Sequence, residues 1–390
     1  AARPGRSGLG LAAAVCAAVG PAPLGARDPL RGEYGFLTDF GGVSAEDARA
    51  RVRYMWDFFR ILEFQFYDAF HGYSYPPPQA ESWRSPFGRP VKRDILMAYT
   101  DEIARLGGRS WLYVQAAAID PGDGKTQTRT GVKVIGQHVV DGRPLLDVVA
   151  PNAAWARWIA ADWASFAVAY NFSGIHWDTL GNKFGIETAG GDIPGFLRAA
   201  QPILRRHGLA QTCNFVDGFG WETSLHGGVG WAGNTVAFPY LEAWTLPEAE
   251  DTFFNKVAPH GGGVFVHYPG YSEKHTAEVW NPNAFGIWPL DLLILRWQKA
   301  RCHGSAYLAI GDGARHLQDE YFPNAVPISE SDAVKIRNLV FQTCAFFTTC
   351  HAPSPERGVP PWGYGAAALV GTLLFCLGRC SAKSMGVAPL

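Results

Sequence analysis

The chain has 390 residues, of which 47% are hydrophobic and 18% are charged, and this is enough apolar material for one large globular core. Its 34 basic and 35 acidic residues give a formal net charge of −1, so the charge balance argues against nucleic acid as a partner. Aromatic residues make up 13% of the chain and include 14 Trp. Most of them belong in the core, but such a surplus also suits stacking against sugar rings.

The two ends of the chain differ from the middle. Residues 1–32 carry Arg3 and Arg6, an uncharged Ala- and Gly-rich stretch, and then small residues around Ala26. This pattern predicts a secretory signal and hence a secreted or extracellular protein; a disordered leader or organelle-targeting segment is the alternative. Residues 353–390 form an apolar tail whose strongest run is shorter than the roughly 20 residues that span a bilayer. We expect a non-catalytic tail, with a marginal membrane anchor as the alternative and as the one route to membrane association.

Between residues 33 and 352 short apolar runs alternate with longer amphipathic segments. The predicted strands are Gly35–Phe40, Glu63–Asp68, Ser110–Gln115, Ser173–Asp178, Gln211–Val216, Thr235–Leu241, Gly263–His267 and Ser305–Ile310. The predicted helices are Ala45–Arg60, Lys92–Leu106, Ala153–Tyr170, Pro194–His207, a short turn near Trp221–Leu225, Pro247–Val257, Pro289–Arg301 and Ser331–Thr348. Eight strand–helix pairs indicate an α/β fold, a (β/α)8 TIM barrel, as one catalytic domain. Its long, Gly- and Pro-rich connections follow the carboxyl ends of the strands, where barrels build active sites.

Two carboxylates end predicted strands of this barrel. Asp178 follows the alternating run Gly174–Trp177, and Glu242 closes Phe238–Leu241, two βα units further on. Both therefore project into the same barrel mouth, as glycosidic bond cleavage requires of an attacking carboxylate and a proton donor. The proton donor needs a raised pKa, which favours Glu242 beside Leu241 and Trp244; Asp178, with polar neighbours, suits the nucleophile.

Other polar and aromatic residues fall near strand ends and are expected to contact the substrate. They are Asp39, Tyr67, Asp68, His176, Asn214, Asp217, Trp244, Tyr268 and Asp312. A group of acids could instead bind a hard cation, but these come from different strands and form no spaced D-x-D-x-D loop. The cysteines show no zinc-ligand spacing. We expect neither a metal nor a cofactor.

Six segments, in order, make the chain resemble glycoside hydrolase family 66, the dextranases and cycloisomaltooligosaccharide glucanotransferases. They are Tyr34–Phe40, Phe64–Asp68, Gly174–Gly181, Asn214–Gly220, Leu241–Trp244 and Ile310–Asn324. The resemblance implies a retaining TIM-barrel glycosidase acting on α-1,6-linked glucan. The family's nucleophile falls on Asp178 and its acid/base on Glu242, which matches the roles assigned from their neighbours.

The chain departs from the family at several places. After Tyr67-Asp68 it reads Ala69–Tyr73 where the family has Trp and an Arg-His pair, and Ala309 replaces an acidic residue. Neither flanking β-sandwich domains nor the large insertion of the cyclising enzymes fits the sequence. We therefore expect endo-hydrolysis of an α-glucan oligo- or polysaccharide through a covalent glucosyl–Asp178 intermediate. The alternatives are a transglycosylase on an α-glucan and a catalytically weak glycan-binding barrel.

Overall fold

The computed structural model describes residues 30–78, 80–140, 142–180, 186, 188–215, 235–243, 253–254, 262–267, 290–316 and 326–342. These residues belong to one compact unit. The predicted leader, except for its last three residues, and the predicted tail from residue 353 lie outside them.

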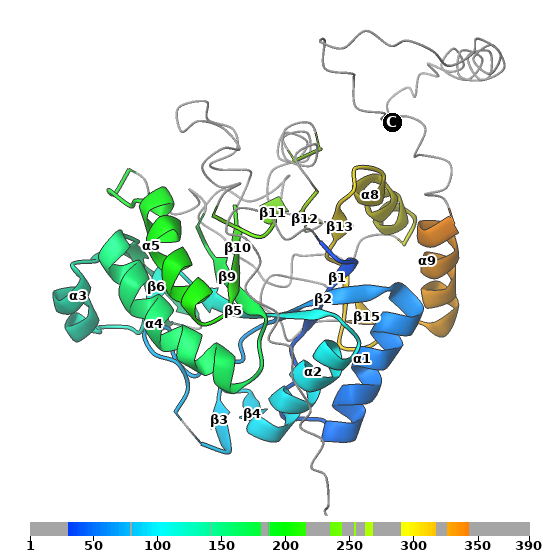
Figure 1. The fold of residues 1–390 in the computed structure, drawn as a ribbon, viewed down its shortest axis with the longest axis horizontal. Helices are drawn as coiled ribbons and strands as arrows, with labels where there is room; N and C mark the ends of the chain where they lie inside the picture. The colour runs from blue at the N-terminus through cyan, green and yellow to red at the C-terminus, as the bar shows by residue number, and fades with distance from the viewer. Residues whose placement is uncertain are drawn as a thin grey trace, which may run out of the picture. The chain divides into compact units, whose positions relative to one another are not determined.

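The parallel sheet has eight strand positions, and its labelled strands lie among the helices in Figure 1. Seven are continuous strands in chain order: β1 (Glu33–Leu37), β2 (Ile61–Phe66), β5 (Arg109–Gln115), β9 (Gly174–Asp178), β10 (Ala210–Asn214), β11 (Pro239–Ala243) and β12 (Val264–His267). The eighth is split into β13 (Ala306–Tyr307), which pairs with β12, and β14 (Ile310–Gly311), which pairs with β1. Because β13 and β14 are nearly consecutive, these pairings close the sheet, and the predicted (β/α)8 barrel is confirmed.

The closure depends on a glycine. Phe36 of β1 lies opposite Gly311 of β14, and a Cβ added to Gly311 would lie 2.3 Å from the Phe36 carbonyl oxygen. That distance is a hard clash with backbone, so only glycine allows β14 to approach β1 this closely.

The described helices lie outside the strands in Figure 1. Six of them correspond to predicted helices: α1 (Ala45–Phe59), α2 (Arg93–Arg105), α4 (Ala153–Ala169), α5 (Ile193–Arg206), α8 (Leu290–Cys302) and α9 (Glu330–Gln342). The predicted helical segments Trp221–Leu225 and Pro247–Val257 lie outside the described residues, apart from Phe253 and Phe254. Among the helices that the structure describes, none combines the length and apolar character needed to cross a bilayer.

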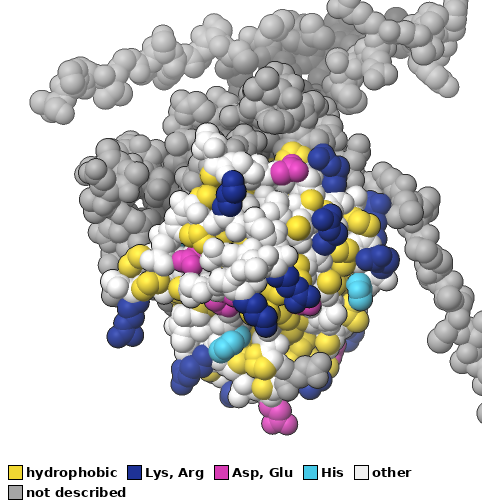
Figure 2. All heavy atoms as spheres, turned by 90° about the vertical axis from the view of Figure 1, so that its left-hand side faces the viewer, with side chains coloured by type: hydrophobic (Ala, Val, Ile, Leu, Met, Phe, Trp, Pro, Cys, Tyr) yellow, Lys and Arg dark blue, Asp and Glu magenta, His cyan; other side chains and the backbone are white. Residues whose placement is uncertain are grey.

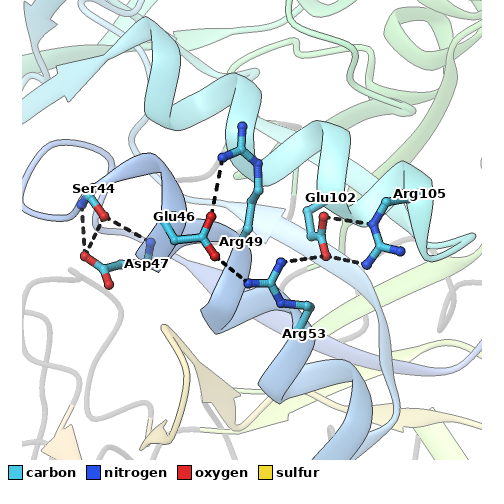
Figure 3. Close-up of polar contacts among 7 residues, drawn as sticks. All are labelled: Ser44, Glu46, Asp47, Arg49, Arg53, Glu102 and Arg105. Atoms are coloured by element: carbon cyan, nitrogen blue, oxygen red, sulfur yellow. Dashed lines mark hydrogen bonds and ion pairs between the residues drawn. The ribbon is translucent and has the colours of Figure 1, made fainter.

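Helix α1 begins at a capping box and is tied to α2 by charged side chains (Figure 3). The Ser44 hydroxyl accepts a hydrogen bond from the Asp47 backbone N–H at 3.1 Å, and the Asp47 carboxylate accepts one from the Ser44 N–H at 3.3 Å. Arg53 bridges the helices, with Glu46 of α1 at 2.9 Å and Glu102 of α2 at 3.3 Å. The capping box fixes the start of α1, and the Arg53 bridge holds together the two helices that flank β2.

Two insertions that the sequence analysis treats as loops contain strands. The connection after β2 forms a hairpin of β3 (Ser82–Arg84) and β4 (Pro90–Lys92). The one after β5 holds α3 (Gly124–Thr130) and an antiparallel sheet of β6 (Ala118–Ile119), β8 (Arg143–Ala150) and β7 (Lys133–Val140). After β14 come β15 (Arg315–His316) and β16 (Val326–Pro327). Figure 2 presents the side of α3, where charged side chains are spread between apolar and uncharged ones.

The barrel interior is polar as well as aromatic. At its lower end Glu63 of β2 accepts hydrogen bonds from Arg109 Nε at 2.9 Å and from Trp111 Nε1 at 2.7 Å. Glu63 and Arg109 are both almost fully buried, and the guanidinium also lies over the Trp111 ring. Burying a charge is tolerable only with such an opposite charge and full hydrogen bonding.

Candidate active site

Asp178 is the last residue of β9, and it is buried, with 8% of its surface exposed. Its Oδ2 accepts hydrogen bonds from the Tyr113 hydroxyl at 2.6 Å, Gln115 Nε2 at 3.0 Å and the Thr179 hydroxyl at 2.7 Å. Its Oδ1 accepts one from Asn214 Nδ2 at 2.7 Å. Such charge-assisted bonds fix the orientation of a carboxylate, and pre-orientation is what a nucleophile needs.

The backbone immediately after Asp178 is strained. Thr179 has φ +61°, a left-handed conformation that is an outlier for a β-branched residue. Strained residues of this kind cluster at active sites, where the surrounding structure holds them in place. Here the Thr179 hydroxyl is held by both Asp178 and Gln115.

Glu242 lies on β11, 5% exposed, and shares a partner with Asp178. Asn214 Nδ2, which donates to Asp178 Oδ1, also donates to Glu242 Oε2 at 2.5 Å. The Asn214 Oδ1 in turn accepts the Glu242 backbone N–H at 3.3 Å. Since one nitrogen lies 2.7 Å from one carboxylate oxygen and 2.5 Å from the other, those oxygens are at most 5.2 Å apart, the sum of the two distances.

Three tyrosines lie around this carboxylate pair. Burial and the neighbouring Asp178 raise the pKa of Tyr113 well above its ordinary value, so its hydroxyl stays protonated and donates to Asp178. Burial likewise raises the pKa of Tyr67, and the hydroxyls of Tyr67 and Tyr240 lie 3.3 Å apart. The predicted site residue Tyr67 thus lies beside the carboxylates, on the inside of the barrel.

The predicted residues Asp39, Asp68 and Asp312 lie at a different part of the mouth. Asp39 and Asp312 both face Arg51, at 3.3 and 3.9 Å. Asp68 pairs with Arg89 at 2.7 Å, and burial raises its pKa to about 6. Asp178 contributes to that rise through its charge, so Asp68 links this part of the mouth to the carboxylate pair.

His176 is fully buried on β9, two residues before Asp178. Its ring stacks on Tyr113 with centroids 6.0 Å apart and meets Tyr240 edge-on at 4.6 Å. Burial lowers its pKa to about 4, although the Asp178 charge opposes the shift. The imidazole is therefore neutral at pH 7 and lies in the layer beneath the carboxylate pair.

His176 and Asp68 should dominate the acid response of this region with opposite signs. The folded pKa of His176, about 4, lies below its ordinary 6.5, so the unfolded chain binds the extra proton and stability falls as pH drops through that window. The folded pKa of Asp68, about 6, lies above its ordinary 3.8, so the folded state binds its proton more tightly than the unfolded chain does. Asp68 therefore favours the folded state at low pH, and this stabilisation is lost as pH rises through the folded pKa. Each effect amounts to about 3 kcal/mol across its window.

Urea unfolding at pH 4 to 7 separates the two contributions. Relative to the parent, His176→Phe should gain about 3 kcal/mol of stability as pH is lowered from 7 to 4. Over the same range Asp68→Asn should lose a similar amount. Identical pH slopes for all three proteins would show that neither group titrates with the shifted pKa.

Three predicted site residues, Asp217, Trp244 and Tyr268, lie outside the described residues. The sequence analysis missed Tyr113 and Gln115 as partners of Asp178, and it did not foresee that Asn214 bridges two carboxylates. A signal was present, because Tyr113 and Gln115 are two apart at the end of a predicted strand and so share a face. Arg51 on α1 and Arg89 in the β3–β4 hairpin left no such signal, since their partners Asp39, Asp312 and Asp68 lie on other elements.

The barrel fold, with two carboxylates paired at its strand ends, is the arrangement expected of a glycosidase-type (β/α)8 barrel. A family model described as "Glycosyl hydrolase family 66" matches residues 30–199, so the predicted resemblance to this family is confirmed.

Two proteins illustrate the relationship. A cycloisomaltooligosaccharide glucanotransferase of Niallia circulans is 23% identical over 279 residues, covering 62% of this chain and 28% of the relative. The chain thus spans under a third of that relative's length. A cycloisomaltooligosaccharide glucanotransferase of Paenibacillus sp., solved with cycloisomaltoheptaose, superposes with a TM-score of 0.64 at 15% identity, covering 83% of this chain and 67% of that one. At that identity the likeness shows the barrel fold.

Proposed function

We propose that this protein is a retaining glycosidase that cleaves internal bonds of an α-1,6-linked glucan, through a covalent glucosyl–Asp178 intermediate. The observation that carries the proposal is the Asn214 bridge, which keeps an Asp178 oxygen and a Glu242 oxygen within 5.2 Å. Retaining glycosidases hold their carboxyl groups about 5–5.5 Å apart, whereas inverting ones leave about 6.5–9.5 Å for a water molecule. The substrate class is supported by the relatives, both named for isomalto-oligosaccharides.

The proposed reaction has two steps. Asp178 attacks the anomeric carbon while the bond to the leaving oxygen breaks and Glu242 gives that oxygen its proton. Glu242, now ionised, then takes a proton from water as the water oxygen attacks the same carbon and releases Asp178. The hydrogen bonds from Tyr113, Gln115 and Asn214 orient Asp178 for attack. They also stabilise its negative charge when the carboxylate is released in the second step.

Glucosyl transfer to a second sugar is the alternative that the comparisons favour, because the named relatives are glucanotransferases. The chemistry differs only in the second step, where a sugar hydroxyl replaces water. Incubation of the full chain with dextran, followed by reducing-sugar assay and mass spectrometry, separates the two. Hydrolysis raises the number of reducing ends in linear products; transfer yields cyclic or longer products with little net gain.

No release from dextran by the folded protein would refute the α-1,6 glucanase proposal. Tight glucan binding without turnover would then favour a glycan-binding barrel, which Ala309 and the altered Ala69–Tyr73 loop would suit. We also propose secretion, on the pattern of residues 1–32, which is tested by whether the native protein is recovered outside the cell with that segment removed.

Asn214 should matter to catalysis through both carboxylates. Replacing it by Ala removes a donor to Asp178 and to Glu242 at once, so we expect kcat to fall by about 10²-fold with a much smaller change in KM. Steady-state kinetics on dextran check this. An unchanged kcat in a folded Asn214→Ala protein would mean that the bridge does not orient the reacting groups.

A further inference from the structure

The two carboxylate oxygens of Asp178 have different surroundings. Oδ2 lies within hydrogen-bond distance of three donors, the Tyr113 hydroxyl at 2.6 Å, Gln115 Nε2 at 3.0 Å and the Thr179 hydroxyl at 2.7 Å. Among the described residues Oδ1 has one donor, Asn214 Nδ2 at 2.7 Å. An ionised carboxylate offers about two lone-pair sites on each oxygen. The three donors therefore fill Oδ2, whereas Oδ1 keeps a lone pair free to form a covalent bond.

Oδ1 is also the oxygen that faces the second carboxylate. Asn214 Nδ2 joins Asp178 Oδ1 to Glu242 Oε2, so the short spacing between the two carboxylates is measured from Oδ1. If Oδ1 attacks, it becomes the single-bonded oxygen of the glucosyl ester and Oδ2 becomes its carbonyl oxygen. Oδ2 then loses negative charge in the first step and regains it in the second.

The Thr179 hydroxyl lies between two acceptors. It is within hydrogen-bond distance of both Asp178 Oδ2 and Gln115 Oε1, but a hydroxyl has one proton and donates to one acceptor at a time. A charged acceptor forms the stronger hydrogen bond. The preferred acceptor therefore depends on whether Asp178 is ionised or esterified.

The backbone holds Thr179 in this place against its own preference. Its φ of +61° is left-handed, which is unfavourable for a β-branched residue. Contacts on both sides fix it, because the Ala116 N–H donates to the Asp178 carbonyl at 3.1 Å and the Leu180 side chain is fully buried. Strain of this kind persists where the surrounding structure imposes it, and it concentrates at functional sites.

We propose that Asp178 attacks through Oδ1 and that Thr179 is a positioning residue, whose hydroxyl donates to Oδ2 of the charged carboxylate and turns to Gln115 in the ester. In the first step an Oδ1 lone pair bonds to the anomeric carbon, the bond to the leaving oxygen breaks and Glu242 protonates that oxygen. In the second, water that gives its proton to Glu242 bonds to the same carbon, and the electron pair returns to the carboxylate. The Thr179 proton stays on its own oxygen throughout.

This role acts on one step of the proposed function, on which it rests. A donor that stabilises the charged carboxylate lowers the barrier to its release in the second step. The same donor gives no advantage to attack, because the charge is already present before the first step and is lost in it. Loss of the Thr179 hydroxyl should therefore slow breakdown of the ester and leave its formation nearly unchanged.

The test is steady-state kinetics of the full chain on α-isomaltosyl fluoride, whose leaving group departs without a proton from Glu242, so that breakdown of the ester limits the rate. Thr179→Val keeps the β-branched shape and lacks the hydroxyl, and its kcat should fall about ten-fold, the range for one hydrogen bond to a charged group. KM should fall in proportion, so that kcat/KM stays within about two-fold of the parent. Intact mass spectrometry of acid-quenched samples should show more of the covalent isomaltosyl ester.

Two further variants separate the hydroxyl from the shape of the side chain. Thr179→Ser keeps the hydroxyl, and both its kcat and its KM should stay within about two-fold of the parent. Thr212→Val is the matched control, because Thr212 is a buried threonine of β10 whose hydroxyl donates to the Phe238 carbonyl at 2.9 Å. It should likewise leave both constants within about two-fold of the parent.

The outcomes separate the positioning role from the function. Equal falls of kcat and kcat/KM in folded Thr179→Val, without extra ester, would overturn the role of Thr179, while turnover by the parent would leave the proposed function standing. A loss in Thr179→Ser as large as that in Thr179→Val would overturn the assignment to the hydroxyl. No turnover of the fluoride or of dextran by the folded parent would overturn the proposed function and the inference with it.

Discussion

Asp178→Ala and Glu242→Gln should each abolish nearly all activity on dextran, with kcat/KM reduced by about 10³-fold or more. Asp178→Ala removes the group that forms the covalent bond, and Glu242→Gln keeps the shape of the side chain but cannot transfer a proton. The measurement is initial-rate kinetics on the full chain. Asp57→Asn, at an exposed position of α1, is the control and should keep the parent's rate.

The two losses should differ in kind. Azide can occupy the space vacated in Asp178→Ala and attack the anomeric carbon directly, so we expect partial recovery of rate with a glucosyl azide as product. In Glu242→Gln, substrates whose leaving group needs no proton should recover more than dextran does. Full activity in either folded variant would remove that residue from the mechanism.

Breaking the buried ion pair at the base of the barrel should produce the largest loss of stability. Glu63→Gln leaves the almost fully buried Arg109 guanidinium without its counter-charge, and we expect unfolding to become easier by about 3–5 kcal/mol. Glu63 is also the acceptor for Trp111 Nε1 and for the Arg31 backbone N–H, so the change disturbs three strand-end contacts together. Urea unfolding followed by tryptophan fluorescence measures it.

Two comparisons show whether burial is the cause. The double variant Glu63→Leu/Arg109→Leu should recover much of the loss, because removing both charges leaves none uncompensated. Asp291→Asn breaks the exposed pair with Lys335 and should change stability by less than about 1 kcal/mol. Equal losses in Glu63→Gln and Asp291→Asn would contradict the role given to burial.

The barrel strands could be predicted because most of them are short, largely apolar runs bounded by polar or glycine-rich residues. The sheet of β6, β7 and β8 could not be read in the same way, because its apolar residues are interrupted by polar ones such as Gln137, His138 and Asp147. Its signal is Asp141-Gly142 between two equal segments, a dipeptide typical of tight hairpin turns. The break of the eighth strand between Tyr307 and Ile310 depends on contacts with two different neighbours and leaves no local pattern.

The site was predictable to the extent that it lies at strand ends. Asp178 and Glu242 are found there directly, and Asn214 ends the strand between theirs, which is why it can bridge them. The hydrogen-bond partners of a side chain depend on differences of a few tenths of an ångström in the positions of atoms, which the sequence does not encode locally. His176 illustrates the limit, because it precedes Asp178 by two residues in the same strand, yet its ring packs between Tyr113 and Tyr240.

The central claim is that Asp178 and Glu242 act as a nucleophile and an acid/base pair on an α-linked glucan. Proton NMR of the first products released from an isomalto-oligosaccharide tests it, because the anomeric signals of newly formed reducing ends appear before mutarotation mixes them. We predict that the α-anomer forms first, since two successive displacements at one carbon retain its configuration. Initial release of the β-anomer would show a single displacement by water and would contradict the mechanism.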